Sequence, residues 1–159
     1  MNGTSGIPAP SGRGGSQPFR FVELAQEING RMPGYVTERA AELLNRHAQP
    51  VNGARVLLLG VTYKKDAADQ RESPARPLAR KLRGRGAVVS YHDPYVPEWQ
   101  VDGQAVPRAT DLEAALAEAD LVILLQPHAA YEPAQIARAA RLLLDTRGVA
   151  PAAPHVEAL

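Results

Sequence analysis

The stretch LLLGVTYKKDAADQRESPARPLARKL, residues 57–82, decides the fold, because an apolar run changes here into a charged loop and then into a helical pattern. The run at 55–61, RVLLLGV, is typical of a strand that is buried on both faces of a parallel sheet. After the loop, Ser73 is expected as the N-cap of a helix, with Pro74 at the first helical position. A strand that leads into a helix in this way is the repeating unit of α/β folds.

The rest of the chain repeats this alternation. Further strands are expected at residues 87–93, 120–126 and 142–146, helices at about 111–119 and 134–140, and a short extended piece at 101–107. Parallel strands joined by right-handed crossovers place helices on both faces of the sheet. We therefore predict an α/β domain with a Rossmann-like, three-layer parallel sheet.

The composition divides the chain into three parts. Residues 1–18 are almost all Gly, Ser, Pro and small polar groups, so we expect a disordered tail. Residues 19–49 show helical spacing that Pro33 interrupts, which predicts either one kinked helix or two helices in series. This segment could be an ordinary packing helix or a connecting and dimerisation helix. Residues 50–159 form the predicted α/β domain.

The overall composition excludes several classes of function. The 159 residues are 45% hydrophobic and carry a net charge of +1, which gives no general electrostatic reason to bind nucleic acid or membrane. Cysteine is absent, which excludes disulfides, thiolate metal sites and a cysteine nucleophile within this sequence. The four histidines show no metal-ligand spacing. Because no signal peptide or membrane span is visible, we expect a cytoplasmic location.

Three segments follow the ends of predicted strands: residues 62–72, 126–128 and 145–147. Ligands of open α/β sheets bind at the carboxyl ends of the strands, so these segments should share one rim. Tyr63 could stack on a base or a sugar. Four basic side chains on this rim could meet an anionic ligand such as a diphosphate: Lys64, Lys65, Arg71 and Arg147. A solvated loop is the alternative for the two lysines.

A dinucleotide site on this domain is the obvious rival. It requires Gly-x-Gly-x-x-Gly in the first strand–helix turn, where the backbone approaches a pyrophosphate. Here Gly60 is the only one of the three glycines, and Tyr63 and Lys64 occupy the space of the cofactor. Asp93 stands where a ribose-binding acid would be, but without the glycines we expect it to cap the turn Asp93-Pro94.

Four ordered segments, GVTYKKD (60–66), DQRESP (69–74), YHDPYV (91–96) and DTR (145–147), resemble the C-terminal domain of the nucleotide-sugar 6-dehydrogenases, the UDP-glucose/GDP-mannose dehydrogenase family. YKKD and YHDPYV are most similar to the branch that acts on UDP-N-acetylhexosamines. Upstream, ELAQEING and RMPGYVTERAAELLN resemble the helix that connects the two domains of this family. The resemblance covers about residues 19–149.

The resemblance implies a reaction and a set of site residues. Family enzymes use two NAD molecules to oxidise the C6 alcohol of a nucleotide sugar to a carboxylate, through a thioester on a catalytic cysteine. The C-terminal domain binds the nucleotide end of the substrate, and the central helix builds the dimer. By this resemblance, Tyr63 and Lys64 contact the UDP-sugar and Arg147 lies near the uridine. Arg71 reaches towards the NAD that the other domain holds.

The chain also departs from the family pattern. The glycine-rich NAD domain and the cysteine segment are absent, so no residue is assigned a catalytic role and we expect a truncated chain that performs no oxidation alone. Gly148 replaces a common asparagine, and Gln126-Pro127 replaces Thr-Asp or Thr-Asn. The partners implied are a UDP-sugar and either a second copy of the chain or a separate N-terminal half. A stand-alone UDP-sugar-binding or regulatory module, and a folded relic without a ligand, are the alternatives.

Overall fold

The computed structural model describes residues 16–70 and 73–159, with side chains described from residue 31 onward. The chain divides into two units, Met1–Met32 and Pro33–Leu159. Helix α1, Ser16–Arg46, contains Pro33 and is a single helix, so the alternative of two helices in series is wrong, while a kink at Pro33 stays a prediction. The predicted tail extended to residue 18, whereas α1 begins at Ser16; residues 1–15 of that tail lie outside the described residues.

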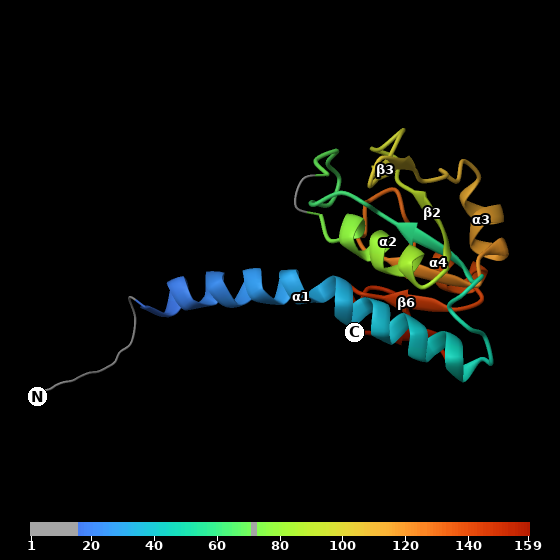
Figure 1. Cartoon of the computed structure of the whole chain (residues 1–159), viewed down its shortest axis with the longest axis horizontal. Coiled ribbons are helices and arrows are strands. Elements are labelled where there is room, and N and C mark those ends of the chain that lie inside the picture. Colours follow the sequence, from blue (N-terminus) through green and yellow to red (C-terminus); the bar gives the residue numbers. More distant parts are fainter. Residues whose placement is uncertain (1–15, 71–72) are drawn as a thin grey trace, which may run out of the picture. The chain divides into compact units, whose positions relative to one another are not determined.

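Within the described residues of the second unit, five strands form one parallel sheet in the order β2-β1-β5-β6-β7 (Figure 1). The strands are β1 Arg55–Leu59, β2 Val88–His92, β5 Leu121–Leu124, β6 Leu143–Asp145 and β7 Val156–Ala158. Every residue of β5 is buried, as expected for a strand inside a parallel sheet. The predicted parallel α/β sheet is confirmed, and β7 is a strand that the sequence pattern did not predict.

Helices cover both faces of this sheet (Figure 1). They are α2 Ala75–Gly84, α3 Leu112–Glu118 and α4 Pro133–Ala139, together with the second half of α1. Leu57 and Leu59 pack with α3 and α4 on one face. Alternate residues of a strand point to opposite faces, so the equally buried Val56 and Leu58 face the other side. The extended piece predicted at 101–107 is a small antiparallel hairpin of β3 Gln100–Val101 and β4 Gln104–Ala105.

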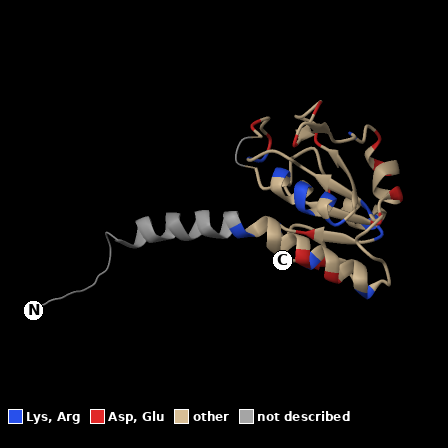
Figure 2. Ribbon diagram, in the orientation of Figure 1, with Lys and Arg blue, Asp and Glu red and all other residues tan. Residues whose placement is uncertain are grey.

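The second half of α1 belongs to the core of the second unit. Its buried side chains follow the helical spacing of the sequence: Val36, Ala40, Leu43 and Leu44. On the same helix, Arg39 and Arg46 form ion pairs with Glu157 of β7. In the ribbon of Figure 2, most charged residues of the described part lie on helices and loops, and few lie on strands. This part of α1 is therefore a packing helix.

The predicted start of α2 is displaced by one residue. The helix begins at Ala75, and Pro74 is the residue that precedes its first turn. The Ser73 hydroxyl still accepts a hydrogen bond from the Ala75 N–H at 3.1 Å, so it supplies a local cap. At α3 the Asp111 carboxylate caps the helix by accepting from the Ala114 N–H at 3.2 Å.

The strand at one edge of the sheet, β2, is partly covered by residues 107–109. The Tyr91 N–H donates to the Pro107 carbonyl at 3.0 Å, and the Ala109 N–H donates to the Tyr91 carbonyl at 2.7 Å. These bonds use the outward-facing backbone groups of Tyr91.

Among the described helices, none is long and apolar enough to cross a lipid bilayer.

Candidate functional site

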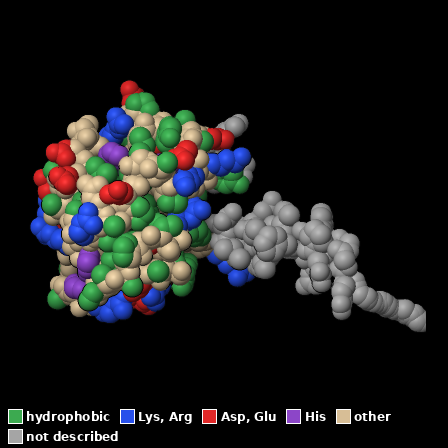
Figure 3. Space-filling view, turned by 180° about the vertical axis from the view of Figure 1, so that it is seen from behind, with side chains coloured by type: hydrophobic (Ala, Val, Ile, Leu, Met, Phe, Trp, Pro, Cys, Tyr) green, Lys and Arg blue, Asp and Glu red, His purple; other side chains and the backbone are tan. Residues whose placement is uncertain are grey.

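The loops that follow β1, β5 and β6 meet at one rim of the sheet. These three strands are hydrogen-bonded neighbours and run parallel, so their carboxyl ends lie on the same side. The predicted candidate residues follow these strands. On the described part of the face drawn in Figure 3, basic and acidic side chains are interspersed, in keeping with the net charge of +1.

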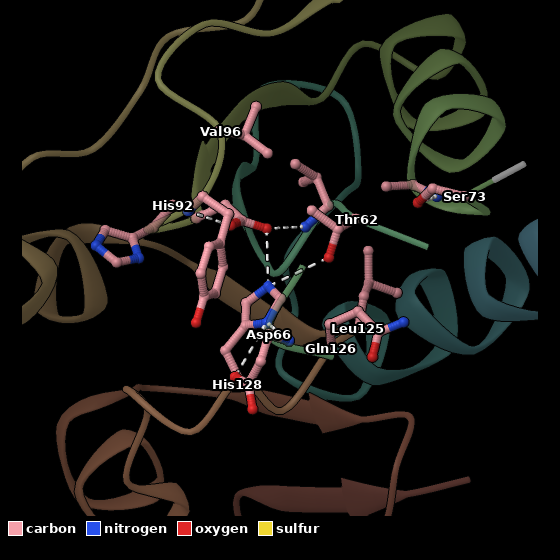
Figure 4. Close-up of polar contacts among 12 residues, drawn as sticks. Thr62, Asp66, Ser73, His92, Val96, Leu125, Gln126 and His128 are labelled. Carbon is pink, nitrogen blue, oxygen red and sulfur yellow. Dashed lines mark hydrogen bonds and ion pairs between the residues drawn. The ribbon is translucent and has the colours of Figure 1, made fainter. Parts of the chain in front are cut away.

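His128 joins the loops after β1, β2 and β5 (Figure 4). Its side chain is wholly buried, and Nδ1 accepts the Asp66 backbone N–H at 2.7 Å. A backbone N–H can only donate, so this bond assigns the ring proton to Nε2. Nε2 lies 3.0 Å from Oδ2 of Asp93 and 3.3 Å from Oγ1 of Thr62, both of which can accept from it. A neutral imidazole therefore ties the three loops together.

Asp93 is the buried acceptor at the centre of this network. Oδ2 accepts the Val61 N–H at 2.7 Å in addition to the His128 proton, and Oδ1 accepts the Tyr95 N–H at 2.8 Å. The bond to Tyr95 caps the turn after β2, which confirms the predicted role of Asp93. With three donors from the protein, the carboxylate acts as a structural anchor.

The loop of residues 62–66, the lysine loop, is held by hydrogen bonds at its base and exposed at its tip. Asp66 has a positive φ of 57°, and its carboxylate accepts the Ala129 N–H at 2.6 Å. The Thr62 hydroxyl donates to the Lys64 carbonyl at 2.7 Å, which closes the loop upon itself. The side chains of Lys64 and Lys65 are exposed and form no ion pair with a carboxylate of the described residues. Their charges are therefore available to an anion.

Arg147 follows β6 in a turn that Asp145 organises. The buried Asp145 carboxylate accepts the N–H groups of Arg147 at 3.0 Å, Gly148 at 2.9 Å and Ala150 at 2.7 Å. Gly148 has a φ of 68° in this turn. Glycine and asparagine both tolerate that left-handed conformation, so glycine at position 148 suits the backbone of this turn.

Gln126 connects Arg147 with the lysine loop. Its Nε2 donates to the Tyr63 carbonyl at 2.6 Å, and its Oε1 accepts from Nη1 of Arg147 at 2.9 Å. The structure thus brings together Tyr63, Arg147 and, next to Tyr63, Lys64. Arg71, the remaining candidate, lies outside the described residues.

The turn after β1 is packed directly against the segment that follows β5. A Cβ atom at Gly60 would lie 2.6 Å from both the Cβ and the carbonyl oxygen of Gln126. Here the glycine makes room for a neighbouring loop, which is a different use from the approach of a pyrophosphate in a dinucleotide fingerprint. These residues do not fit a dinucleotide at this turn.

A second pair, His92 and Tyr131, adjoins the network of His128. The Tyr131 hydroxyl donates to the His92 carbonyl at 2.8 Å and lies 2.9 Å from His92 Nδ1, which therefore donates to it. Burial, aided by the positive charge of Arg108, lowers the pKa of His92, and burial raises the pKa of Tyr131. Both groups are neutral at pH 7. Among the described residues, no three His, Asp or Glu side chains gather as a metal site.

Gln126 and His128 help to build this site in ways that the sequence did not predict. Both were expected on the rim, but Gln126 was noted only as a departure from a family pattern. The signal available was a polar pair directly after the apolar strand at 121–124, where a parallel sheet places ligand-binding loops. His128 contacts Thr62 and Gln126 contacts Tyr63, and in both pairs the residues are more than 60 positions apart in the sequence. A local sequence pattern cannot predict contacts between such distant residues.

Comparisons with known proteins agree with this architecture. Residues 57–152 match the UDP-binding domain of the UDP-glucose/GDP-mannose dehydrogenase family. The chain is 30% identical over 113 residues to UDP-N-acetyl-D-mannosamine dehydrogenase of Methanococcus maripaludis, covering 71% of this chain and 25% of that protein. It is 31% identical over 135 residues to NDP-N-acetyl-D-galactosaminuronic acid dehydrogenase of Ralstonia solanacearum, covering 82% of this chain and 30% of that protein.

Solved structures give the same result. The NDP-N-acetyl-D-galactosaminuronic acid dehydrogenase of Methanosarcina mazei superimposes with a TM-score of 0.68 at 27% identity, covering 92% of this chain and 30% of that one. The chain thus spans about a quarter to a third of the length of the relatives it matches. The resemblance stated from the sequence is confirmed. The chain belongs to the UDP-glucose/GDP-mannose dehydrogenase family, and residues 57–152 are its UDP-binding domain.

Proposed function

We propose that the rim formed by Tyr63, Lys64 and Arg147 binds the nucleoside diphosphate end of a UDP-sugar. The observation that carries this proposal is the hydrogen-bonded bridge through Gln126, which holds Arg147 beside the lysine loop. An ammonium and a guanidinium group that face the same rim suit the two negative charges of a diphosphate. The exposed ring of Tyr63 offers a surface for a base or a sugar.

The proposed reaction is that of the whole dehydrogenase: oxidation of the C6 alcohol of a UDP-sugar to a carboxylate. The names of the relatives favour an N-acetylhexosamine as the sugar. NAD would supply the oxidising power and would be held mainly by a separate domain, because the turn at Gly60 does not fit a dinucleotide. Arg71 remains proposed as the residue that reaches that cofactor from this side.

This chain contributes binding to the reaction and no nucleophile. The 159 residues contain no cysteine, so the thiol of the proposed thioester would come from another polypeptide segment. We therefore expect that the purified chain produces no NADH from UDP-N-acetylglucosamine and NAD. Production of NADH by the chain alone would contradict this assignment. Dimerisation through residues 19–49, pairing with a separate N-terminal half and a cytoplasmic location remain predictions.

Calorimetric titration with UDP and UDP-N-acetylglucosamine tests the proposed site. Lys64→Ala removes an exposed ammonium group from the rim, and we expect it to weaken binding of either ligand about tenfold, which is about 1.4 kcal/mol. Lys81→Ala is the matched control, because Lys81 is an exposed lysine in the last turn of α2. It should bind like the unaltered chain.

Two results would contradict the proposal. Absence of binding by a folded chain would show that these residues do not form a nucleotide site by themselves, which favours the relic. Equal affinities of the Lys64→Ala chain and the unaltered chain would show that UDP binds elsewhere. Binding of UDP-sugar without any gain of oxidation on addition of an N-terminal half would favour a stand-alone binding module.

A further inference from the structure

We infer that Gln126 is a positioning residue that presets both sides of the UDP site, through Tyr63 on one side and Arg147 on the other. The inference rests on the proposed function and adds to it a residue that the predicted site did not include. Gln126 is only 7% exposed, and both ends of its amide are engaged with protein. It therefore acts through its two neighbours.

The chemistry of the partners fixes the orientation of the amide. A backbone carbonyl can only accept, so the Nε2 group must face Tyr63. A guanidinium group can only donate, so Oε1 must face Arg147. A flipped amide would break both bonds at once, and the side chain has a single favourable arrangement.

The backbone of Gln126 is held as firmly as its side chain. Its N–H lies 3.3 Å from the Leu59 carbonyl at the end of β1. The Gly60 Cα approaches it so closely that even a methyl group would collide with its carbonyl oxygen. The amide is therefore presented from a firmly held position just after β5, beside the end of β1.

The bridge leaves the ligand-binding groups free. The described contacts of Arg147 use Nη1, which donates to Gln126 and, at 3.3 Å, to the Leu125 carbonyl. Nε and Nη2 remain available to a phosphate or a base. The bond at the Tyr63 carbonyl holds the backbone that carries the Tyr63 and Lys64 side chains. A preset arginine and a preset loop lose less freedom when a ligand binds, so affinity rises without any contact from Gln126.

A double-mutant cycle on the full chain separates positioning from general stabilisation. Gln126→Met keeps the length of the side chain and removes both bonds. We expect it to weaken UDP binding about tenfold in calorimetry. In an Arg147→Met background the same change should cost only about threefold, because one of its two routes is already lost. Gln126→Glu keeps an acceptor for Arg147, but it sets an oxygen against the Tyr63 carbonyl and adds a negative charge beside the diphosphate, so its affinity should fall at least as far as that of Gln126→Met.

Gln135→Met on α4 is the control for a glutamine-to-methionine change away from the rim, and it should leave the affinity for UDP unchanged. Urea unfolding midpoints, measured beside each titration, separate affinity from stability. Equal loss of affinity from Gln126→Met in both backgrounds would overturn positioning through Arg147. Unchanged affinity of Gln126→Met and Gln126→Glu would overturn the inference while the proposed function stands. Absence of UDP binding by the unaltered chain would overturn both.

Discussion

Replacing Asp93 with asparagine tests the buried network that shapes the rim. The Asp93 carboxylate accepts three hydrogen bonds, two at Oδ2 and one at Oδ1. An asparagine has one oxygen and one NH2 group. If its oxygen takes the Oδ2 place, the Val61 and His128 bonds survive, but the NH2 group faces the Tyr95 N–H. The opposite orientation sets the NH2 group against two donors and costs more.

The less costly orientation of the asparagine determines how much the free energy of unfolding falls. Loss of a hydrogen bond to a charged acceptor costs about 1.5–3 kcal/mol, and the two remaining bonds lose the assistance of the charge. We expect Asp93→Asn to lower the free energy of unfolding by about 2–4 kcal/mol. Asp111→Asn is the control, because an asparagine caps α3 as well as an aspartate does, and it should change stability by less than about 0.5 kcal/mol.

Urea unfolding followed by tryptophan fluorescence measures this difference. The chain has one tryptophan, Trp99, which is 3% exposed and whose ring centre lies 5.3 Å from that of Tyr91 on β2. Its emission therefore reports unfolding of the part of the domain that holds Asp93. A loss below about 1 kcal/mol relative to Asp111→Asn would refute the reasoning, because it would show that the three bonds are replaceable.

Two further predictions concern neighbouring positions. Gly60→Ala forces a methyl group against Gln126 at a φ of 80°, whereas Gly53→Ala meets open space at a φ of 86°. Both substitutions strain the backbone, so the urea midpoint should fall for both variants and distinctly more for Gly60→Ala. Equal midpoints for the two variants would show that the turn at Gly60 relaxes freely. His92 has a lowered pKa in the folded state, so its stabilisation is complete above the ordinary histidine pKa near 6.5 and is lost as the pH falls through the folded value. Urea midpoints between pH 7 and pH 5 should therefore fall less steeply in His92→Gln than in the unaltered chain, and identical slopes would contradict the neutral assignment.

The strands could be predicted where their own residues carry the signal. The apolar runs at 55–61 and 120–126 form β1 and β5. Both strands are buried on both faces, so their own apolar residues are enough to predict them from the sequence. β7 could not be found in this way. Its residues, Val156–Ala158, are only partly buried, and they form a strand because β6 offers a free edge to pair with.

The candidate site, like the strands, could be predicted only in part from the sequence. Its location followed from topology alone, because the carboxyl ends of parallel strands share a rim. The residues that organise it did not, since the bonds of Gln126 and His128 reach loops distant in the sequence. Gly148 shows the complementary case, because a residue that looks like a lost polar group in the sequence adopts the φ of 68° in its turn without strain.

The cover over the edge strand β2 has a consequence for self-association. An open strand edge is a template on which a second molecule can add a strand and begin to aggregate. Pairing with residues 107–109 removes the Tyr91 backbone groups from that template. Pro107 has no N–H to offer outward, so the covering segment is itself a poor starting point for further strands. This edge of the sheet is thus partly protected against intermolecular growth, with the section around the exposed Val88 as its open remainder.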